Sequence, residues 1–144
     1  MANTGNYQLF VYGSLLSGFK SPAYDYISQF FDLVGEGKVK GLLFDMGEYP
    51  AAVPADFHDS FIEGELYTIR NHQEFSWAIA QLDDYEGVLV EANQAALYRR
   101  EAVQVVTDAG VTTTAWIYWY NGDVSGRPRI ESGNLLNYIA SRQG

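Results

Sequence analysis

Short apolar runs recur along the chain, and several of them have the alternation expected of β-strands. Tyr7–Tyr12 is aromatic and apolar, which predicts a buried strand. In Val39–Phe44 and in Phe61–Ile69, residues alternate between two faces. Glu63 and Glu65 fall together on one face of the second run, so we expect that strand to have one face in water.

The second half of the chain carries the pattern of a long β-hairpin. Leu97–Thr107 and Val111–Tyr120 are rich in β-branched and aromatic residues. Asp108–Gly110 lies between them and is typical of a tight turn. We therefore expect two antiparallel strands joined at this turn.

Helix signals flank the predicted strands. Ser21 before Pro22 is a typical helix start, and the apolar spacing that follows predicts a helix over Pro22–Val34. Asn71 with a glutamate three residues later predicts a second start. A short terminal helix is expected over Leu135–Arg142.

The remaining segments are predicted as loops, and the whole chain as one domain. Pro50 and Pro54 favour an extended loop between them, and the polar, glycine-rich stretch Asn121–Gly133 also favours a loop. No repeat or linker divides residues 1–144. The expected fold is therefore a single α+β domain, a small mixed β-barrel of about five to seven strands with flanking helices.

One acidic residue interrupts the apolar stripe of the second predicted helix. Phe75, Ile79 and Leu82 share a face, and Glu86 falls on the same face if the helix extends that far. Burial raises the pKa of a carboxyl group, as an acid/base at neutral pH requires. The alternative is that Glu86 lies beyond the helix and caps it or pairs with Arg99 or Arg100.

Composition excludes several classes of function. The formal net charge of −9 opposes binding to phosphate backbones and anionic membrane surfaces, so we expect neither nucleic acid nor membrane as partner. The chain has no cysteine, which excludes thiol catalysis and thiolate metal sites. The N-terminus has no basic or apolar run, and we expect a cytoplasmic protein.

Four segments, with a later strand pattern, carry a resemblance to a known family. They are Phe10–Leu15 (FVYGSL), Phe44–Ala51 (FDMGEYPA), Ile62–Tyr67 (IEGELY) and Leu82–Gly87 (LDDYEG). Over roughly residues 7–120 the chain resembles the γ-glutamylcyclotransferase-like (AIG2-like) family.

The resemblance implies an activity and a set of site residues. The family cleaves a γ-glutamyl amide by internal attack, releasing 5-oxoproline and an amine, and needs no metal or organic cofactor. It implies Glu86 as the catalytic acid/base. The residues it suggests for substrate binding are Tyr12, Gly13, Ser14, Leu15, Tyr98, Arg100 and Tyr118.

Each of these assignments has a structural alternative. Tyr98 and Arg100 could serve strand packing and a salt bridge, and Tyr118 could be a core residue. Ser14 has no nearby histidine that would make it a nucleophile, and His58 and His72 lack metal-ligand spacing.

The expected partner is a small γ-glutamyl substrate, a γ-glutamyl amino acid or a γ-glutamylamine, bound by a monomer or weak homodimer. The chain lacks the arginine often found just after YGSL, and Val88–Ala96 is long and apolar, so these features bear on the leaving amine. The alternatives are a non-catalytic small-molecule binding domain that retains the same pocket, and an interaction domain.

Overall fold

The computed structural model describes residues 7–12, 22–46, 50–54, 60–85, 98–130, 133 and 138. Most of the secondary structure in these ranges is β-strand. The elements in chain order are β1 (Gln8–Val11), α1 (Pro22–Phe30), β2 (Phe31–Lys40), β3 (Leu42–Asp45), β4 (Pro50–Val53), β5 (Phe61–Ile69), the 3₁₀ helix η2 (His72–Glu74), α2 (Phe75–Tyr85), β6 (Tyr98–Thr107) and β7 (Thr112–Tyr120).

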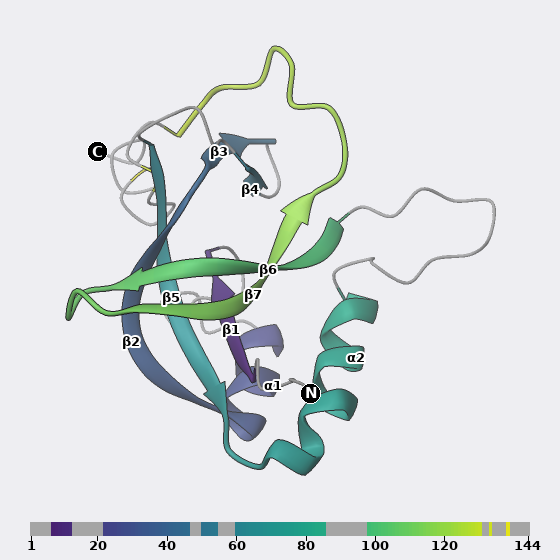
Figure 1. Cartoon of the computed structure of the whole chain (residues 1–144). Coiled ribbons are helices and arrows are strands. Elements are labelled where there is room, and N and C mark those ends of the chain that lie inside the picture. The colour runs from purple at the N-terminus through teal and green to yellow at the C-terminus, as the bar shows by residue number, and fades with distance from the viewer. Residues whose placement is uncertain are drawn as a thin grey trace.

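Five strands form a closed barrel in the order β1–β5–β2–β6–β7 (Figure 1). β1 lies antiparallel to β5, with Val11 opposite Glu65. β1 also closes the barrel against β7 by a parallel pairing of Leu9 with Trp116. β3 and β4 form a separate two-stranded sheet. The predicted mixed barrel with flanking helices is confirmed.

The two faces of the strands build two separate apolar clusters. One cluster joins Leu9, Val11 and Tyr67 to side chains of α1 and α2. The other collects the alternate residues of the same strands, including Phe10 and Leu66, with side chains of β3 and β4. Because neighbouring residues of a strand point to opposite faces, each strand contributes to both clusters.

The first helix is shorter than the sequence pattern predicts. The prediction of a helix over Pro22–Val34 is wrong at its C-terminal end, because α1 ends at Phe30 and Val34 is exposed in β2. Arg70 donates side-chain hydrogen bonds to the carbonyl oxygens of Ser28 and Gln29, at 2.5 and 2.9 Å, and pairs with Asp32 at 2.7 Å. A cation at the last carbonyls stabilises a helix end.

Two further predictions fail where the chain depends on distant partners. The single strand Val39–Phe44 is interrupted at Gly41, where a side chain would meet the carbonyl oxygen of Val53 at 2.9 Å. The predicted loop between Pro50 and Pro54 is instead β4, paired with β3. Pro50 is tolerated because it is the first residue of its strand.

The second helix begins where predicted. The side chain of Asn71 accepts a hydrogen bond from the backbone N–H of Gln73, and one 3₁₀ turn leads into α2. In Figure 1, α2 starts at the end of the barrel where β5 ends and runs back upward beside it. The ring of Phe75, at the start of α2, meets the ring of Tyr7 at 5.4 Å, so α2 and β1 begin together.

The predicted hairpin is confirmed, with β6 and β7 paired from Tyr98 and Tyr120 down to the turn at Asp108–Gly110. Residues 121–129 form the expected loop, apart from one bridge between Phe44 and Arg129. The predicted terminal helix Leu135–Arg142 lies, except for Tyr138, outside the described residues.

Neither α-helix of the described ranges is a candidate membrane span. α1 has nine residues and α2 has eleven, too few to cross a bilayer.

Gly64 allows an unusually close approach of β5 to the end of β1. A Cβ atom at this position would lie 2.1 Å from the carbonyl oxygen of Val11 and 2.8 Å from the ring of Phe10. No side chain larger than hydrogen fits there without moving the backbone. Gly64 therefore fixes the position of Val11, two residues before the glycine of the YGSL segment.

We expect Arg70→Met to lower the free energy of unfolding by about 1–2 kcal/mol, because the charge-assisted hydrogen bonds to the end of α1 are lost. Urea denaturation measures the change. Asp32→Asn, which removes only the exposed ion pair, should cost less than about 1 kcal/mol. Arg127→Met, the same charge change at an exposed loop residue, should be near neutral. Equal losses in all three variants would contradict a capping role.

Gly64→Ala should lower the free energy of unfolding by about 2–3 kcal/mol, since the new methyl group forces β1 and β5 apart at Val11. Thermal or urea denaturation tests this. Gly35→Ala is the matched strand variant, because a Cβ at Gly35 meets nothing within 4 Å and only its backbone angle, φ +156°, opposes the change. If both variants lose the same stability, the close contact at Val11 is not what requires glycine.

Candidate functional site

Half of the predicted site residues fall within the described ranges. Tyr12, Tyr98, Arg100 and Tyr118 are described, whereas Glu86 and the three residues Gly13–Leu15 lie outside the described residues. The geometry of the site is therefore built from the strands that lead into these segments.

Tyr12 and Tyr118 are joined directly. The hydroxyl group of Tyr12 donates a hydrogen bond to the carbonyl oxygen of Tyr118, and both side chains are buried. This bond links the first residue of the YGSL segment to β7 across 106 positions of sequence. The start of the loop after β1 is thereby held against the last third of β7.

Tyr98 is packed and hydrogen-bonded at the start of β6. Its hydroxyl group donates to the carbonyl oxygen of Pro50 at 2.9 Å, and its ring meets that of Tyr120 at 5.7 Å. Only 7% of the residue is exposed. These contacts give Tyr98 a packing role that joins β6 to β4.

Arg100 lies directly opposite Tyr118 in the β6–β7 ladder. Its guanidinium group stands over the ring of Trp116, 4.5 Å from the centroid, as in a cation–π contact. Arg99, on the other face of β6, forms an exposed ion pair with Glu101 at 2.9 Å. The two neighbouring arginines therefore serve different faces of the strand.

The ladders bring Tyr98, Arg100 and Tyr118 to one face of the barrel, whereas the side chain of Tyr12 belongs to the cluster on the other face. Tyr98 and Arg100 are two residues apart in β6 and therefore share one face of that strand. Their partners Tyr120 and Tyr118 share the same face of β7. Tyr98, Tyr118 and Tyr120 belong to the cluster that also contains Leu82 of α2. The face that carries Arg100 is therefore the face covered by the helix that precedes Glu86.

Glu65 is less exposed than the sequence pattern predicts. The face of β5 that it shares with Glu63 was expected to be wet, but Tyr67 and Ile69 on that face are 2% and 4% exposed. Glu65 itself is half-buried, and its Oε1 accepts a hydrogen bond from the hydroxyl group of Tyr67 at 3.0 Å. Only the beginning of the strand is wet, because the helices cover the rest. A half-buried carboxylate next to a buried tyrosine could not be recognised from alternation alone.

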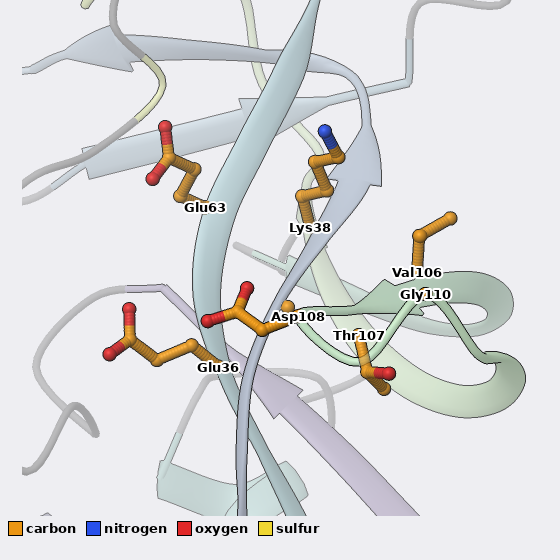
Figure 2. Close-up of a pocket in the computed structure, with 8 residues that line it drawn as sticks. Glu36, Lys38, Glu63, Val106, Thr107, Asp108 and Gly110 are labelled. Atoms are coloured by element: carbon orange, nitrogen blue, oxygen red, sulfur yellow. The ribbon is translucent and has the colours of Figure 1, made fainter.

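A hollow of about 450 Å³ lies at a different place, beside the β6–β7 turn (Figure 2). Acidic side chains and one lysine line it, with residues of the turn: Glu36, Gly37, Lys38, Glu63, Val106, Thr107, Asp108 and Gly110. None of the four described site residues is among them. Within the described ranges, no three acidic or histidine side chains are grouped closely enough to hold a metal ion.

Hydrogen bonds perturb one carboxyl group in the loop after β7. Ser125 donates to Asp123 from its side chain and from its backbone N–H, the latter at 2.9 Å, and these bonds hold the pKa of Asp123 below its usual range. The residue is fully exposed. It stabilises a surface turn that contains none of the predicted site residues.

Known proteins are similar to this chain in both sequence and fold. A γ-glutamylcyclotransferase family protein, ytfP of Citrobacter rodentium (strain ICC168), is 32% identical over 131 residues, 90% of this chain and 96% of that protein. The solution structure of Escherichia coli ytfP superposes with a TM-score of 0.61 at 28% identity, covering 92% of this chain and 98% of that one. The crystal structure of YkqA from Bacillus subtilis superposes with a TM-score of 0.70 at 26% identity, and the match covers 97% of this chain but 44% of that one.

The sequence also matches a protein family, γ-glutamyl cyclotransferase, AIG2-like, over residues 9–137. That range runs from β1 to beyond β7 and includes all four segments that carry the resemblance. The closed barrel agrees with the structures of the relatives. The chain therefore belongs to the AIG2-like γ-glutamyl cyclotransferase family.

Proposed function

We propose that this protein is a cofactor-independent cyclotransferase that cleaves a γ-glutamyl amide, from a γ-glutamyl amino acid or a γ-glutamylamine, with Glu86 as general acid/base. Family membership over residues 9–137 carries the proposal. The products are 5-oxoproline and the freed amine.

The reaction needs proton transfer more than it needs a protein nucleophile. The α-amine of the substrate attacks its own side-chain carbonyl carbon, so the nucleophile is already tethered. A new C–N bond closes the five-membered ring as the original amide C–N bond breaks. Glu86 takes one proton from the α-ammonium before the attack and gives it to the leaving nitrogen. The ring nitrogen loses a second proton as the lactam forms, and this proton also passes through Glu86 to the leaving group, which departs as an ammonium.

The lengths of β1 and α2 support a meeting of Glu86 with the YGSL segment. Both elements start together, where Phe75 meets Tyr7, and both run antiparallel to β5. The five steps from Tyr7 to Tyr12 advance about 17 Å in a strand, and the ten steps from Phe75 to Tyr85 advance about 15 Å in a helix. Tyr12 and Tyr85, the last described residues before the two segments, are therefore about equally far from the common start, which supports the proposed meeting.

The described side chains suggest how the substrate is held. Backbone N–H groups at Gly13–Leu15 are suited to a carboxylate, because a glycine lets a ligand approach the backbone. Arg100 offers a guanidinium group on the same face of the barrel. Tyr98 and Tyr118 are buried, and in this proposal they form the wall against which the substrate rests.

Turnover separates this proposal from a binding domain that retains the same pocket. The purified protein is incubated with γ-glutamyl amino acids, γ-glutamyl-lysine isopeptide and simple γ-glutamylamines, and 5-oxoproline is measured by mass spectrometry. We expect catalytic release from at least one class. Binding without release across the panel would identify a non-catalytic module.

Glu86→Gln should reduce turnover by about 10²–10⁴-fold, the usual contribution of a general acid–base group, because the amide cannot exchange a proton. Substrate affinity should change much less, and the melting temperature should hold or rise slightly, because the proposal makes Glu86 a carboxylate on the buried face of its helix and the variant replaces it by a neutral amide. Initial rates, calorimetric binding and thermal unfolding measure the three effects.

Glu74→Gln serves as the matched control, because it makes the same change at an exposed residue just before α2. It should leave the rate unchanged and lower the free energy of unfolding by less than about 1 kcal/mol, because Glu74 is the acidic residue of the first turn after the Asn71 cap. If Glu86 instead pairs with an arginine, Glu86→Gln loses stability and the folded fraction keeps its activity. A stable Glu86→Gln variant with normal turnover would remove Glu86 from the mechanism.

A further inference from the structure

Glu65 lies beside the start of the YGSL segment. In the β1–β5 ladder it is opposite Val11, which immediately precedes Tyr12, and the neighbouring Gly64 brings β5 against the carbonyl group of Val11. The hydroxyl group of Tyr67 holds Oε1 of Glu65 at 3.0 Å, and Tyr67 is almost completely buried. The position of this carboxylate is thus set by a rigid part of the barrel.

Strand register places Glu65 and Arg100 in one row on the same face. Val11 lies opposite Glu65, and Tyr118 lies opposite Arg100. β1 and β7 are parallel with Leu9 beside Trp116, so two residues further along Val11 comes level with Tyr118. The row therefore reads Glu65, Val11, Tyr118, Arg100, and spans three strand spacings, about 14 Å between its outer Cα atoms.

We infer that Glu65 binds the α-ammonium group of the substrate and selects for γ-glutamyl compounds with a free α-amine. The inference rests on the proposed function. An α-amino acid head presents one cation and one anion, and the row presents a carboxylate and a guanidinium group at its two ends. Glu65 lies at the end beside Val11, where the loop assigned to the amino-acid head begins.

Glu65 acts in binding, and Glu86 acts in proton transfer. The carboxylate of Glu65 accepts a hydrogen bond from the α-amino group both before and after that group gives up its proton, so Glu65 contributes about equally to binding of the ground state and of the transition state. One proton passes from the α-ammonium to Glu86, the amine attacks the side-chain carbonyl carbon, and the ring nitrogen loses a second proton as the lactam forms. Glu86 passes both protons to the leaving nitrogen, which departs as an ammonium, and Glu65 takes no part in these transfers.

The test uses the full-length chain and two ligands, L-γ-glutamyl-L-alanine and its des-amino analogue, N-glutaryl-L-alanine. Glu65→Gln should raise KM for γ-glutamyl-alanine by about 10- to 100-fold, the usual effect of losing a charge-assisted hydrogen bond, with kcat within about threefold. Calorimetry should show equal binding of the des-amino analogue by wild type and variant. Tyr67→Phe, which frees the carboxylate from its hydrogen bond, should raise KM by a smaller factor.

Glu63→Gln is the matched control, because it makes the same change two residues earlier, at an exposed residue beside the hollow of Figure 2. Its KM should equal that of wild type. If Glu63→Gln and Glu65→Gln raise KM equally, or if Glu65→Gln weakens the des-amino analogue as much as the substrate, the inference is wrong. If wild type releases no 5-oxoproline from any γ-glutamyl compound, the proposed function itself fails, which is a different outcome.

Discussion

The contact between Gly64 and the carbonyl group of Val11 constrains much of the rest of the structure. β1 has only four residues, and it is held between β5 on one side and β7 on the other. At its end, the close approach to Gly64 and the hydrogen bond from Tyr12 to Tyr118 fix the positions of Val11 and Tyr12.

The direction of β5 determines where α2 begins. β5 runs antiparallel to β1, so its last residue, Ile69, lies near the beginning of β1. A single capped turn at Asn71 reverses the chain, and α2 returns along the barrel by burying Phe75, Ile79 and Leu82. One reversal of direction therefore returns α2, the helix that precedes Glu86, along the same barrel as β1, the strand that precedes the YGSL segment.

Sequence patterns within a few residues are sufficient to predict some elements but not others. β5, the β6–β7 hairpin and the Asn71 cap follow from alternation, turn residues and capping, which act within a few residues. The end of α1 is capped by Arg70, which is 41 residues from Gln29, and the requirement for glycine at position 41 comes partly from the carbonyl oxygen of Val53. The half-burial of Glu65 depends on helices elsewhere in the chain. Propensity carries no information about partners that folding brings from such distances.

Because the chain is strongly acidic, the proposed recognition of the substrate depends on individual charged side chains, here Arg100 and Glu65. With a formal net charge of −9, the protein as a whole repels an anionic ligand, and γ-glutamyl compounds carry at least one carboxylate. At physiological ionic strength, exposed charges beyond about 8 Å are largely screened. Recognition therefore depends on the few charged groups within contact of the ligand. In the proposed function, Arg100 binds the substrate carboxylate and Glu65, three strand spacings away, binds its ammonium group, which is how an acidic protein would bind an amino-acid head.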